Sequence, residues 1–584
     1  MKMTKRIGIV TIITIILVFL LSVAGAQQTP VTRGEFIVSL YNILGLSAPK
    51  TQDTKSQNPI LRLEVVKETI KALSYDDLLP FVSVENLPFP EIRDLKTEDQ
   101  KWVALALALQ PPLLRGDARG MLNLNRPLSR QEFSYLKETL KTYAQGHITF
   151  YREKKIHSHL TLITKKWGFS ATLVPPPEPQ PQGEQFFLQV GAYQDRGRAE
   201  RILSWLKELG YSAQIREENN LFKVRVGPYS REEAKTVGDR LKNQGFSSYP
   251  ILEKGNGAPK QPFSGPVFTL ALLFNPQDAP FHLEVALANN QILDREKTSE
   301  IARRKNALFA INASFFNKAG EPLGLLVADG RVLSEPIDGW YNCGFTADNE
   351  IFFGETKFKA LAITDGDVSY PVKGINRLNQ GNELVLYDQF FGPKTPAQKG
   401  AECMVRNGVV ERVGESQGET AIPPQGFVLQ GRGDAAQWLL RNLAPGRKMR
   451  VKIGLYSVSG ELEKWRRMRY AVSGGPLLFF EGNPGPFGQF NNDVVLKRHP
   501  RTVIGETQNG EILFLAVDGR RPGHSLGLTI EELVEELKNY QVKNALNLDG
   551  GGSTTFYLQG QILNIPADLT GERKISTAIL LQKK

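Results

Sequence analysis

A carboxylate followed by three glycines stands out near the end of this 584-residue chain. Asp549 comes directly after an apolar stretch at residues 545–548 and precedes the segment 550–553, which is Gly-Gly-Gly-Ser. Residues without side chains let backbone amides approach an anion closely, so this turn could hold a phosphate beside a catalytic carboxylate. Residues 555–558 then alternate as a strand, whereas a P-loop or Rossmann turn leads into a helix. A plain glycine-rich turn is the competing interpretation.

Two further segments carry cations. Proline at position 500 keeps His499 out of helical conformation, so His499 and Arg501 should project from the entry to a strand. An arginine offers a planar fork for two phosphate oxygens, whereas a buried structural arginine would need a carboxylate partner. Asp518 ends a second apolar run and is followed by Arg520, a pattern that by itself also suits an ordinary turn.

Asn312 ends another apolar run and could orient sugar hydroxyls or cap a turn. An aspartate, an arginine, a histidine and an amide-lined turn in one domain fit a negatively charged substrate better than a neutral one.

Short strands must position these side chains. Thr529 with Glu532 three residues later forms a capping box for a helix over residues 529–540. The sequence therefore predicts a strand-rich α+β domain over residues 266–584. The predicted strands, which are short, apolar or alternating and bounded by Gly, Asn or Asp, cover residues 281–287, 307–312, 451–455, 512–517 and 545–548.

The motifs of this domain resemble, in type and order, those of the phosphodiester glycosidase family. The resemblance spans about residues 281–581 and implies hydrolysis of a sugar-1-phosphodiester, of the N-acetylglucosamine-1-phosphodiester type, to a reducing sugar and a phosphomonoester. The segments that carry it are Asn312 with Phe315-Phe316, Gly374-Ile375-Asn376-Arg377, Ile422 to Leu429, Ser473-Gly474-Gly475-Pro476, His499-Pro500-Arg501-Thr502, Val517-Asp518-Gly519-Arg520 and Asn547 to Thr554.

The same resemblance implies roles. Arg501 and Arg520 would bind phosphate, Asp549 would be nucleophile or general base, His499 proton donor or phosphate ligand, and Asp518 a second carboxylate. Spacing does not tell which carboxylate acts. The implied substrate contacts are Asn312, Asn376, Arg377, Thr502, Arg520, Gly550, Gly551, Gly552 and Ser553.

No cofactor is required by this interpretation, and a divalent metal stays open. The family often has glycines after the asparagine at position 312 and an aspartate at position 317, whereas this chain has Ala313, Ser314 and Asn317.

Residues 185–254 contain an internal repeat, in which the segment Val190-Gly191-Ala192-Tyr193 is answered by Val226-Gly227-Pro228-Tyr229. Strand, helix and strand twice over is the ferredoxin-like βαββαβ plan. The segment resembles a SPOR domain, a family that binds peptidoglycan glycan strands lacking stem peptides. The same aromatic residues would be core or rim residues in the alternative interpretation. The candidate sugar contacts on an exposed sheet face are Phe187, Gln189, Tyr193, Arg225 and Tyr229.

Residues 27–169 repeat a short signature at the start of amphipathic helical patterns, in Thr32 to Phe36, Leu61 to Val65 and Ser129 to Phe133. A stretch between the last two copies, together with the last copy, resembles a degenerate S-layer homology repeat, a module that holds bacterial proteins to wall polymers. The segments that carry this resemblance are Phe89 to Asp94, Trp102 to Ala108, Leu114-Arg115-Gly116 and Leu128 to Phe133. A helical spacer is the alternative. Proline-rich residues 170–184 and residues 255–265 are predicted linkers.

Residues 1–26 combine a basic start, an apolar run and a small-residue cleavage pattern, which predicts a signal peptide. If it is not cleaved it would anchor the chain to the membrane; in either case the chain lies outside the cytoplasm, in the cell wall or secreted. The net charge of +11, from 72 Lys and Arg against 61 Asp and Glu, favours anionic surroundings. Nucleic acid is not expected for a secreted chain. Whether Cys343 and Cys403 pair is open.

The predicted function is a cell-envelope hydrolase of a glycosyl-phosphate in a wall polymer, tethered to peptidoglycan. The alternatives are a non-catalytic peptidoglycan-binding scaffold and a conventional glycosidase that acts on neutral sugars.

Overall fold

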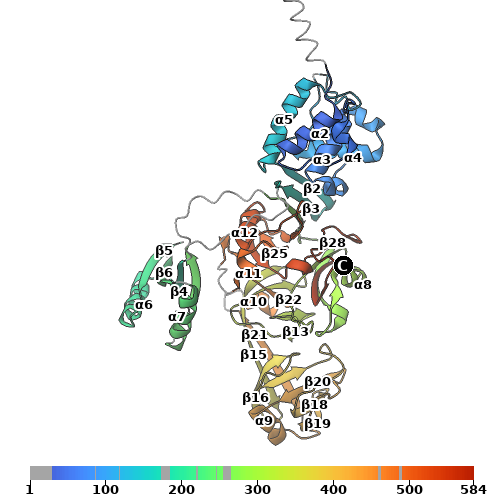
Figure 1. Cartoon of the computed structure of the whole chain (residues 1–584). Coiled ribbons are helices and arrows are strands. Elements are labelled where there is room, and N and C mark those ends of the chain that lie inside the picture. Colours follow the sequence, from blue (N-terminus) through green and yellow to red (C-terminus); the bar gives the residue numbers. More distant parts are fainter. Residues whose placement is uncertain are drawn as a thin grey trace, which may run out of the picture.

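The computed structural model describes residues 29–85, 87–117, 119–171, 185–218, 221–229, 231–244, 246, 248–253, 265–457, 462–485 and 490–584. The predicted signal peptide, nearly all of the linker 170–184 and nearly all of the linker 255–265 lie outside these residues. Figure 1 shows a helical N-terminal part, a small α/β unit and a large strand-rich part. The chain is thus an α+β multidomain protein, as predicted. Among the described helices, none has the length and apolarity that a membrane span requires.

The recurring signature of the N-terminal part starts helices. Thr32 Oγ1 accepts a hydrogen bond from the amide of Glu35, and Ser129 forms a capping box with Glu132. The helices are α2 Arg33–Ile43, α3 Arg62–Ala72, α4 Thr97–Ala108 and α5 Arg130–Ala144, with 3₁₀ turns η1 Gln52–Lys55, η2 Asp76–Phe81 and η3 Pro90–Asp94.

The three copies of the signature interact in a ring. The arginine of each copy pairs with the glutamate of the next, and the last copy returns to the first. Backbone hydrogen bonds among the short segments that precede the three helices join the copies in the same cyclic order. The three copies are therefore arranged with approximate threefold symmetry, while their kinship to S-layer homology repeats stays a prediction. The ion pairs are Arg33–Glu64 at 2.8 Å, Arg62–Glu132 at 2.7 Å and Arg130–Glu35 at 2.9 Å.

The end of this region differs from the helical expectation. Residues 149–167 form a hairpin of β2 (Thr149–His157) and β3 (Leu160–Trp167), preceded by the short β1 (Leu109–Gln110). Threonine and aromatic residues favour strands, and β3 finds an open edge in β8 (Val267–Phe274) of the large part. The hairpin thereby extends the sheet of the C-terminal part.

Residues 185–253 adopt the predicted βαββαβ plan. Its sheet has the order β5-β6-β4-β7, and two helices pack on one face over a core that includes Leu188, Val224 and Leu241. The elements are β4 Gln185–Tyr193, α6 Arg196–Glu208, β5 Ala213–Glu218, β6 Leu221–Tyr229, α7 Arg231–Asn243 and β7 Tyr249–Glu253.

The C-terminal part contains three larger sheets. The antiparallel sheet that matters for the site has the order β1-β2-β3-β8-β26-β25-β27-β23-β24, and a five-stranded sheet, β29-β28-β11-β31-β9, packs against it through a shared core. The third sheet, built largely from β12–β22, reaches out to α9 (Figure 1). Cys343 and Cys403 are buried free thiols.

The strands of this part are β8 Val267–Phe274, β9 Phe281–Leu287, β10 Glu296–Lys297, β11 Phe309–Asn312, β12 Leu326–Ala328, β13 Arg331–Ser334, β14 Tyr341–Thr346, β15 Ile351–Thr364, β16 Ser369–Ile375, β17 Leu384–Tyr387, β18 Gly400–Arg406, β19 Val409–Ser416, β20 Gly426–Gly431, β21 Met449–Ser457, β22 Met468–Gly474, β23 Leu477–Phe480, β24 Asn483–Pro484, β25 Arg501–Thr507, β26 Ile512–Val517, β27 Val542–Asn547, β28 Phe556–Leu558, β29 Gln561–Ile562, β30 Lys574–Ile575 and β31 Thr577–Lys583. The helical segments are η4 Ala288–Asn290, α8 Thr298–Arg304, α9 Asp434–Asn442, α10 Leu462–Arg466, α11 Asn492–Leu496, α12 Ile530–Lys538 and η5 Gly551–Ser553. The predicted strands correspond to β9, β11, β21, β26 and β27, and the predicted helix to α12.

Candidate functional site

Three of the predicted site residues converge at one end of the large sheet. Strand β25 runs antiparallel to both β26 and β27, so its first residue, Arg501, lies beside the carboxyl ends of its two neighbours. Asp518 follows β26 and Asp549 follows β27 by two residues. The sheet therefore brings both carboxylates and the arginine to the same edge.

Asp549 is the carboxylate whose acidity is most altered there. It keeps part of its surface accessible, but desolvation by its surroundings raises its pKa to about 6, against an ordinary 3.8. The hydroxyl of Ser553, the charge of Arg573 and the amide of Gly550 oppose the shift only in part. A carboxyl with this pKa can hold or release a proton near neutral pH, which suits general acid–base catalysis.

Close neighbours surround the three glycines of this turn. A Cβ on Gly550 would lie 2.6 Å from the carbonyl oxygen of Pro500, and one on Gly551 would meet the guanidinium of Arg520 at 3.2 Å. A Cβ on Gly552 would lie 2.2 Å from both Arg573 and Asp568. The turn therefore lies directly beneath two arginines.

The expected amide cradle is only partly available. The amide of Gly551 donates to the carbonyl of Pro500 at 2.9 Å, so it is not free to bind an anion. This corrects the sequence-based role of Gly551, because the tight turn needs that hydrogen bond to close against the entry of β25.

His499 orients Arg520. Arg520 Nη2 donates to His499 Nδ1 at 2.8 Å, and an arginine can only donate, so Nε2–H of the neutral ring donates to the carbonyl of Asp493 at 2.9 Å. Burial, followed by the charges of Arg501 and Arg520, lowers the pKa of His499. A neutral ring with both nitrogens engaged does not fit the expected proton donor; it fits a support for Arg520.

Arg501 is a buried cation with only 3% of its surface exposed. Its Nε donates to the carbonyl of Leu528 and its Nη2 to that of Lys497, both at 2.8 Å, and among the described residues it forms no ion pair. Burial, and next the positive charge of Arg520, lower its pKa to about 9. The charges of Glu532 and Asp493 oppose this shift only in part, so a buried guanidinium in this position lowers the cost of placing an anion nearby.

Asp518 is closed off from any substrate. It is 1% exposed, and its carboxylate is bound by His524 Nε2 at 2.8 Å, Asn564 Nδ2 at 2.9 Å and the amide of Ile565 at 2.8 Å. The prediction of a second catalytic carboxylate at Asp518 is therefore corrected, since its acceptor sites are used to hold the chain around it.

Asn312 lies under the site rather than in it. Its Nδ2 donates to the carbonyl of Asp549 at 2.6 Å, and its Oδ1 accepts from Thr502 Oγ1 at 2.9 Å and from the amide of Thr555 at 3.2 Å. Thr502 is likewise fully buried. Both were predicted to contact substrate, but the buried amide and hydroxyl instead hold the Asp549 turn in place.

Asn376 and Arg377 lie between β16 and β17, in the sheet that reaches toward α9. The side-chain amide of Asn376 donates to the carboxylate of Asp388 through Nδ2 and accepts from the backbone amide of Asp388 through Oδ1. Arg377 donates to Glu335, and it forms two hydrogen bonds to Glu383 at 2.8 and 3.0 Å. These carboxylates raise the pKa of Arg377 in spite of its burial. Saturated in this way, Asn376 and Arg377 stabilise a turn, and their predicted substrate contacts are corrected.

The sequence reasoning missed Arg573 and its partner. Arg573 pairs with Asp568 at 2.8 Å and lies over Gly552, with 42% of its side chain exposed. No local pattern around residue 573 sets this arginine apart, because its relation to Asp549 exists only after the chain has folded back.

Unpartnered polar atoms surround the same turn. Ser314 Oγ and Asn547 Oδ1 are buried and form no hydrogen bond among the described residues. Ser314 follows the strand that carries Asn312, and Asn547 lies two residues before Asp549. Buried polar atoms without a partner are costly, so a polar ligand would relieve them.

The described residues contain no cluster of three or more His, Cys, Asp or Glu side chains arranged to bind a metal. Asn317, where an aspartate is common in the family, uses its amide within its own turn and donates to Glu321 at 2.7 Å.

The candidate glycan contacts of the small α/β unit divide between its two faces. Tyr193 and Tyr229 pack against the helix-covered core, while Phe187, Gln189 and Arg225 lie buried in the sheet. The open stacking face that we expected is therefore not seen. Neighbouring strands cover it in part, because Arg216 lies over the ring of Phe187 and Tyr249 hydrogen-bonds Gln189.

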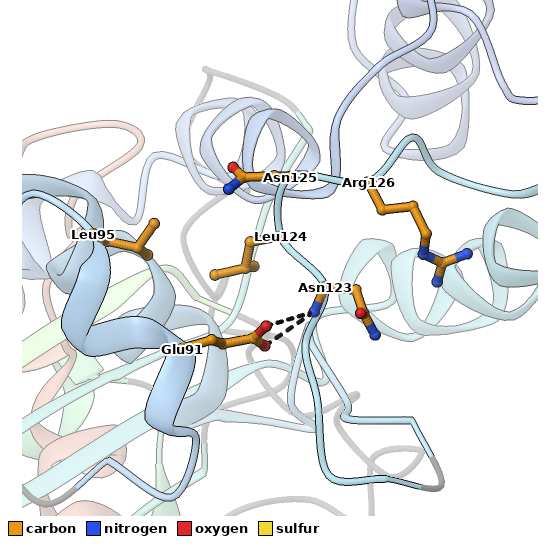
Figure 2. A pocket seen from close by; sticks show the side chains of 6 residues that line it. All are labelled: Glu91, Leu95, Asn123, Leu124, Asn125 and Arg126. Atoms are coloured by element: carbon orange, nitrogen blue, oxygen red, sulfur yellow. Dashed lines mark hydrogen bonds between the residues drawn. The ribbon is translucent and has the colours of Figure 1, made fainter.

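A separate hollow of about 300 Å³ lies in the helical region (Figure 2). On the wall of this hollow, the backbone amide of Asn123 donates a hydrogen bond to both carboxylate oxygens of Glu91, at 3.0 and 3.2 Å. The other lining residues are Leu95, Leu124, Asn125 and Arg126. All six come from the helical region, so the hollow is not part of the site at Asp549.

Comparison with known proteins finds a likeness to phosphodiester glycosidases in the C-terminal part and to SPOR domains in the small α/β unit. The family model for phosphodiester glycosidases matches residues 399–582, and the SPOR domain model matches residues 182–252. The family models thus find both domains that the sequence motifs predicted.

Individual relatives share a smaller part of the chain. N-acetylglucosamine-1-phosphodiester alpha-N-acetylglucosaminidase of Bos taurus is 33% identical over 105 residues, and that of Homo sapiens is 32% identical over 105 residues. In each case the match covers 17% of this chain and 19% of the relative, so the chain spans about a fifth of the length of these curated proteins. A crystal structure of an exported protein from Burkholderia pseudomallei has the same fold, with a TM-score of 0.52, 22% identity and coverage of 74% of this chain and 96% of that one.

Proposed function

We propose that this protein hydrolyses a sugar-1-phosphodiester, of the N-acetylglucosamine-1-phosphodiester type, outside the cytoplasm while its SPOR domain holds it on peptidoglycan. The observation that carries the proposal is the desolvated carboxylate of Asp549, on which the charge of Arg573 acts, followed by a glycine turn that the guanidinium groups of Arg520 and Arg573 approach, within a domain matched by the phosphodiester glycosidase family model.

The charges suit the chemistry of the leaving group. In this hydrolysis water adds to the anomeric carbon, the bond from that carbon to the phosphate oxygen breaks, and the electron pair leaves with the phosphomonoester. A phosphate is a good leaving group once its charge is neutralised, so arginines can replace a general acid. Arg520 and Arg573 would contact the phosphate, and the buried charge of Arg501 would attract it.

Asp549 would supply the remaining function. Ionised above its pKa of about 6, it can accept a proton from the attacking water or attack the anomeric carbon itself. The orphaned oxygens of Ser314 and Asn547 are candidates to bind sugar hydroxyl or acetamido groups. Metal is not needed for any of these steps.

The SPOR domain supports the setting of the reaction. A tether to peptidoglycan raises the effective concentration of the enzyme near glycosyl-phosphate links in wall polymers. Residues 1–26 as a signal peptide, residues 27–169 as a wall-directed helical region and residues 266–584 as the catalytic domain complete this proposal, with linkers 170–184 and 255–265 around the SPOR domain at 185–254.

A product analysis tests the reaction class. The full chain is incubated with an α-N-acetylglucosamine phosphodiester of a simple alcohol and, separately, with the plain glycoside of the same alcohol. Phosphorus NMR should show the diester replaced by a monoester, while the plain glycoside stays intact.

Two variants identify the carboxylate. The variant Asp549→Asn should lose this activity. The control Asp367→Asn makes the same substitution at an exposed turn after β15, in the sheet that reaches toward α9, and should keep the activity. Equal hydrolysis of both substrates, or full activity in Asp549→Asn, would refute the proposal.

A further inference from the structure

The helical N-terminal region is joined to the catalytic sheet as if it were one of its parts. Strand β3 pairs with β8 along its whole length, from Leu160 opposite Phe274 to Trp167 opposite Val267. The rings of Phe81 and Phe268 meet across the junction at 5.5 Å. A hydrophobic core runs without interruption from the helices into the C-terminal part. This junction is therefore unlike a flexible linker between independent domains.

A buried lysine lies at the centre of the junction. Lys166 is completely buried, and its Nζ donates to the carbonyl of Ser74 at 2.6 Å, to Asp77 Oδ2 at 2.7 Å and to the carbonyl of Gly523 at 3.3 Å. Two of these acceptors belong to the helical region and the third to a catalytic-domain loop. One ammonium group thus binds both parts of the molecule.

His524 continues this network to the catalytic domain. Its Nδ1 is hydrogen-bonded to Asp77 Oδ2, and its Nε2 lies 2.8 Å from Asp518 Oδ2. Burial by itself would lower the pKa of His524, but the two carboxylates outweigh it and raise that pKa. The ring therefore links a carboxylate of the helical region to the one that holds residues 564 and 565.

The loop that carries these contacts also carries Arg520. Residues 518–527 fold on themselves, with Ser525 Oγ donating to the carbonyl of Asp518 at 2.6 Å and the amide of Arg521 bonding the carbonyl of Ser525 at 3.0 Å. One side of the loop, at Gly523, abuts Ser74 of the helical region. The other side places the guanidinium of Arg520 over Gly551.

From this arrangement we propose that the helical region completes the catalytic domain, with Asp77 as a positioning residue that acts through His524 and the loop 518–527 on Arg520. The inference rests on the proposed function. It assigns the helical region a role in phosphate recognition that is separate from any binding of wall polymer.

A matched pair of variants of the full chain tests the role of Asp77. Asp77→Asn removes the charge that Lys166 and His524 share, and Asp76→Asn makes the same substitution at the exposed neighbouring position. Hydrogen exchange measured by mass spectrometry should accelerate by about tenfold or more in peptides from residues 518–527 of Asp77→Asn, with β25 and β27 unchanged. Asp76→Asn should exchange like the wild type.

A double-mutant cycle supplies the functional readout. Asp77→Asn should reduce kcat/KM for the phosphodiester by about tenfold, while in an Arg520→Gln background it should have almost no further effect. Additive losses, or no loss in Asp77→Asn, would overturn the inference while leaving wild-type activity, and hence the proposed function, intact. Absence of activity in the wild type would instead reject the proposed function. Hydrogen exchange of residues 518–527 would then still test whether Asp77 is coupled to that loop.

Glycine variants keep the inference testable if Asp77→Asn fails to fold. Gly523 has a φ of +85°, and a Cβ there would lie 3.3 Å from Ser74 Oγ; Gly510 has a φ of +78° with no neighbour within 4 Å of its Cβ. Both substitutions to alanine share the backbone strain, about 1 kcal/mol, but only Gly523→Ala disturbs the contact with the helical region. Faster exchange of residues 518–527 and lower kcat/KM in Gly523→Ala alone would support the inference, and equal behaviour of the two variants would contradict it.

Discussion

Replacing Asp549 by asparagine should stabilise the protein while it abolishes activity. The folded state holds the carboxyl in a desolvated place, which raises its pKa from 3.8 to about 6. At about 1.36 kcal/mol per pKa unit, the ionised side chain destabilises the folded state by about 2 to 3 kcal/mol above pH 6. An asparagine of the same shape carries no charge and avoids that cost.

The sign of the pH dependence follows from the raised pKa. The stabilising effect of the protonated carboxyl is complete below pH 3.8 and is lost as the pH rises through about 6. Asp549→Asn should therefore unfold at a higher urea concentration than the wild type at about pH 8, and at the same concentration at about pH 3.5. Stabilisation upon removal of a catalytic group is the expected trade-off at an active site.

The activity of the wild type should follow the same titration. The kcat/KM for the phosphodiester should rise about tenfold for each pH unit below 6 and level off above it, since only ionised Asp549 acts. Burial lowers the pKa of His499, the histidine that orients Arg520, so His499→Gln serves as a control and should keep the rise near pH 6. Equal urea midpoints for wild type and Asp549→Asn at high pH, or a flat pH profile, would refute the reasoning.

Three further substitutions test the surroundings of this carboxylate. Arg520→Gln should lower kcat/KM for the phosphodiester by about 10- to 100-fold, the usual cost of a hydrogen bond to a charged group, and leave the unfolding midpoint nearly unchanged. Gly552→Ala should displace the ion pair of Arg573 and raise KM measurably, without loss of fold by circular dichroism, because only flexible side-chain ends have to move. Asn312→Ala should lower the free energy of unfolding by about 2 to 4 kcal/mol and reduce kcat, because it strands the buried groups around the Asp549 turn; unchanged stability in that variant would show that the asparagine is not a support.

The elements of the site were predictable from local patterns. Alternating and apolar runs identified β26 and β27, and a capping box identified α12, because the periodicity of a buried strand or helix is written into neighbouring residues. Asp549 and Asp518 were candidates because each is an aspartate that follows an apolar run and precedes glycine, and Arg501 was a candidate because it follows a proline at the entry to a strand. The hairpin at residues 149–167 was missed, because its strand character depends on the edge offered by β8, more than a hundred residues later.

Local patterns could not rank the candidates. Asp518 and Asp549 look alike in the sequence, each an aspartate followed by glycine after an apolar run. The fold surrounds one with His524 and Asn564, and leaves the other desolvated but accessible. Desolvation and the number of donors around a carboxylate depend on which distant segments pack against it.

The amino-acid sequence by itself determined the strand-rich α+β class of the molecule and the two domains that the family models match, and it supplied the residue types on which the proposed function rests. Tertiary structure decided which of those residues are free to react. It brought Arg573 over Gly552, used Asn312 as a support, and joined Asp77 to the loop of Arg520 across more than 400 positions of the chain. Contacts of that separation leave no local pattern, because they are selected by packing rather than by the neighbours along the chain.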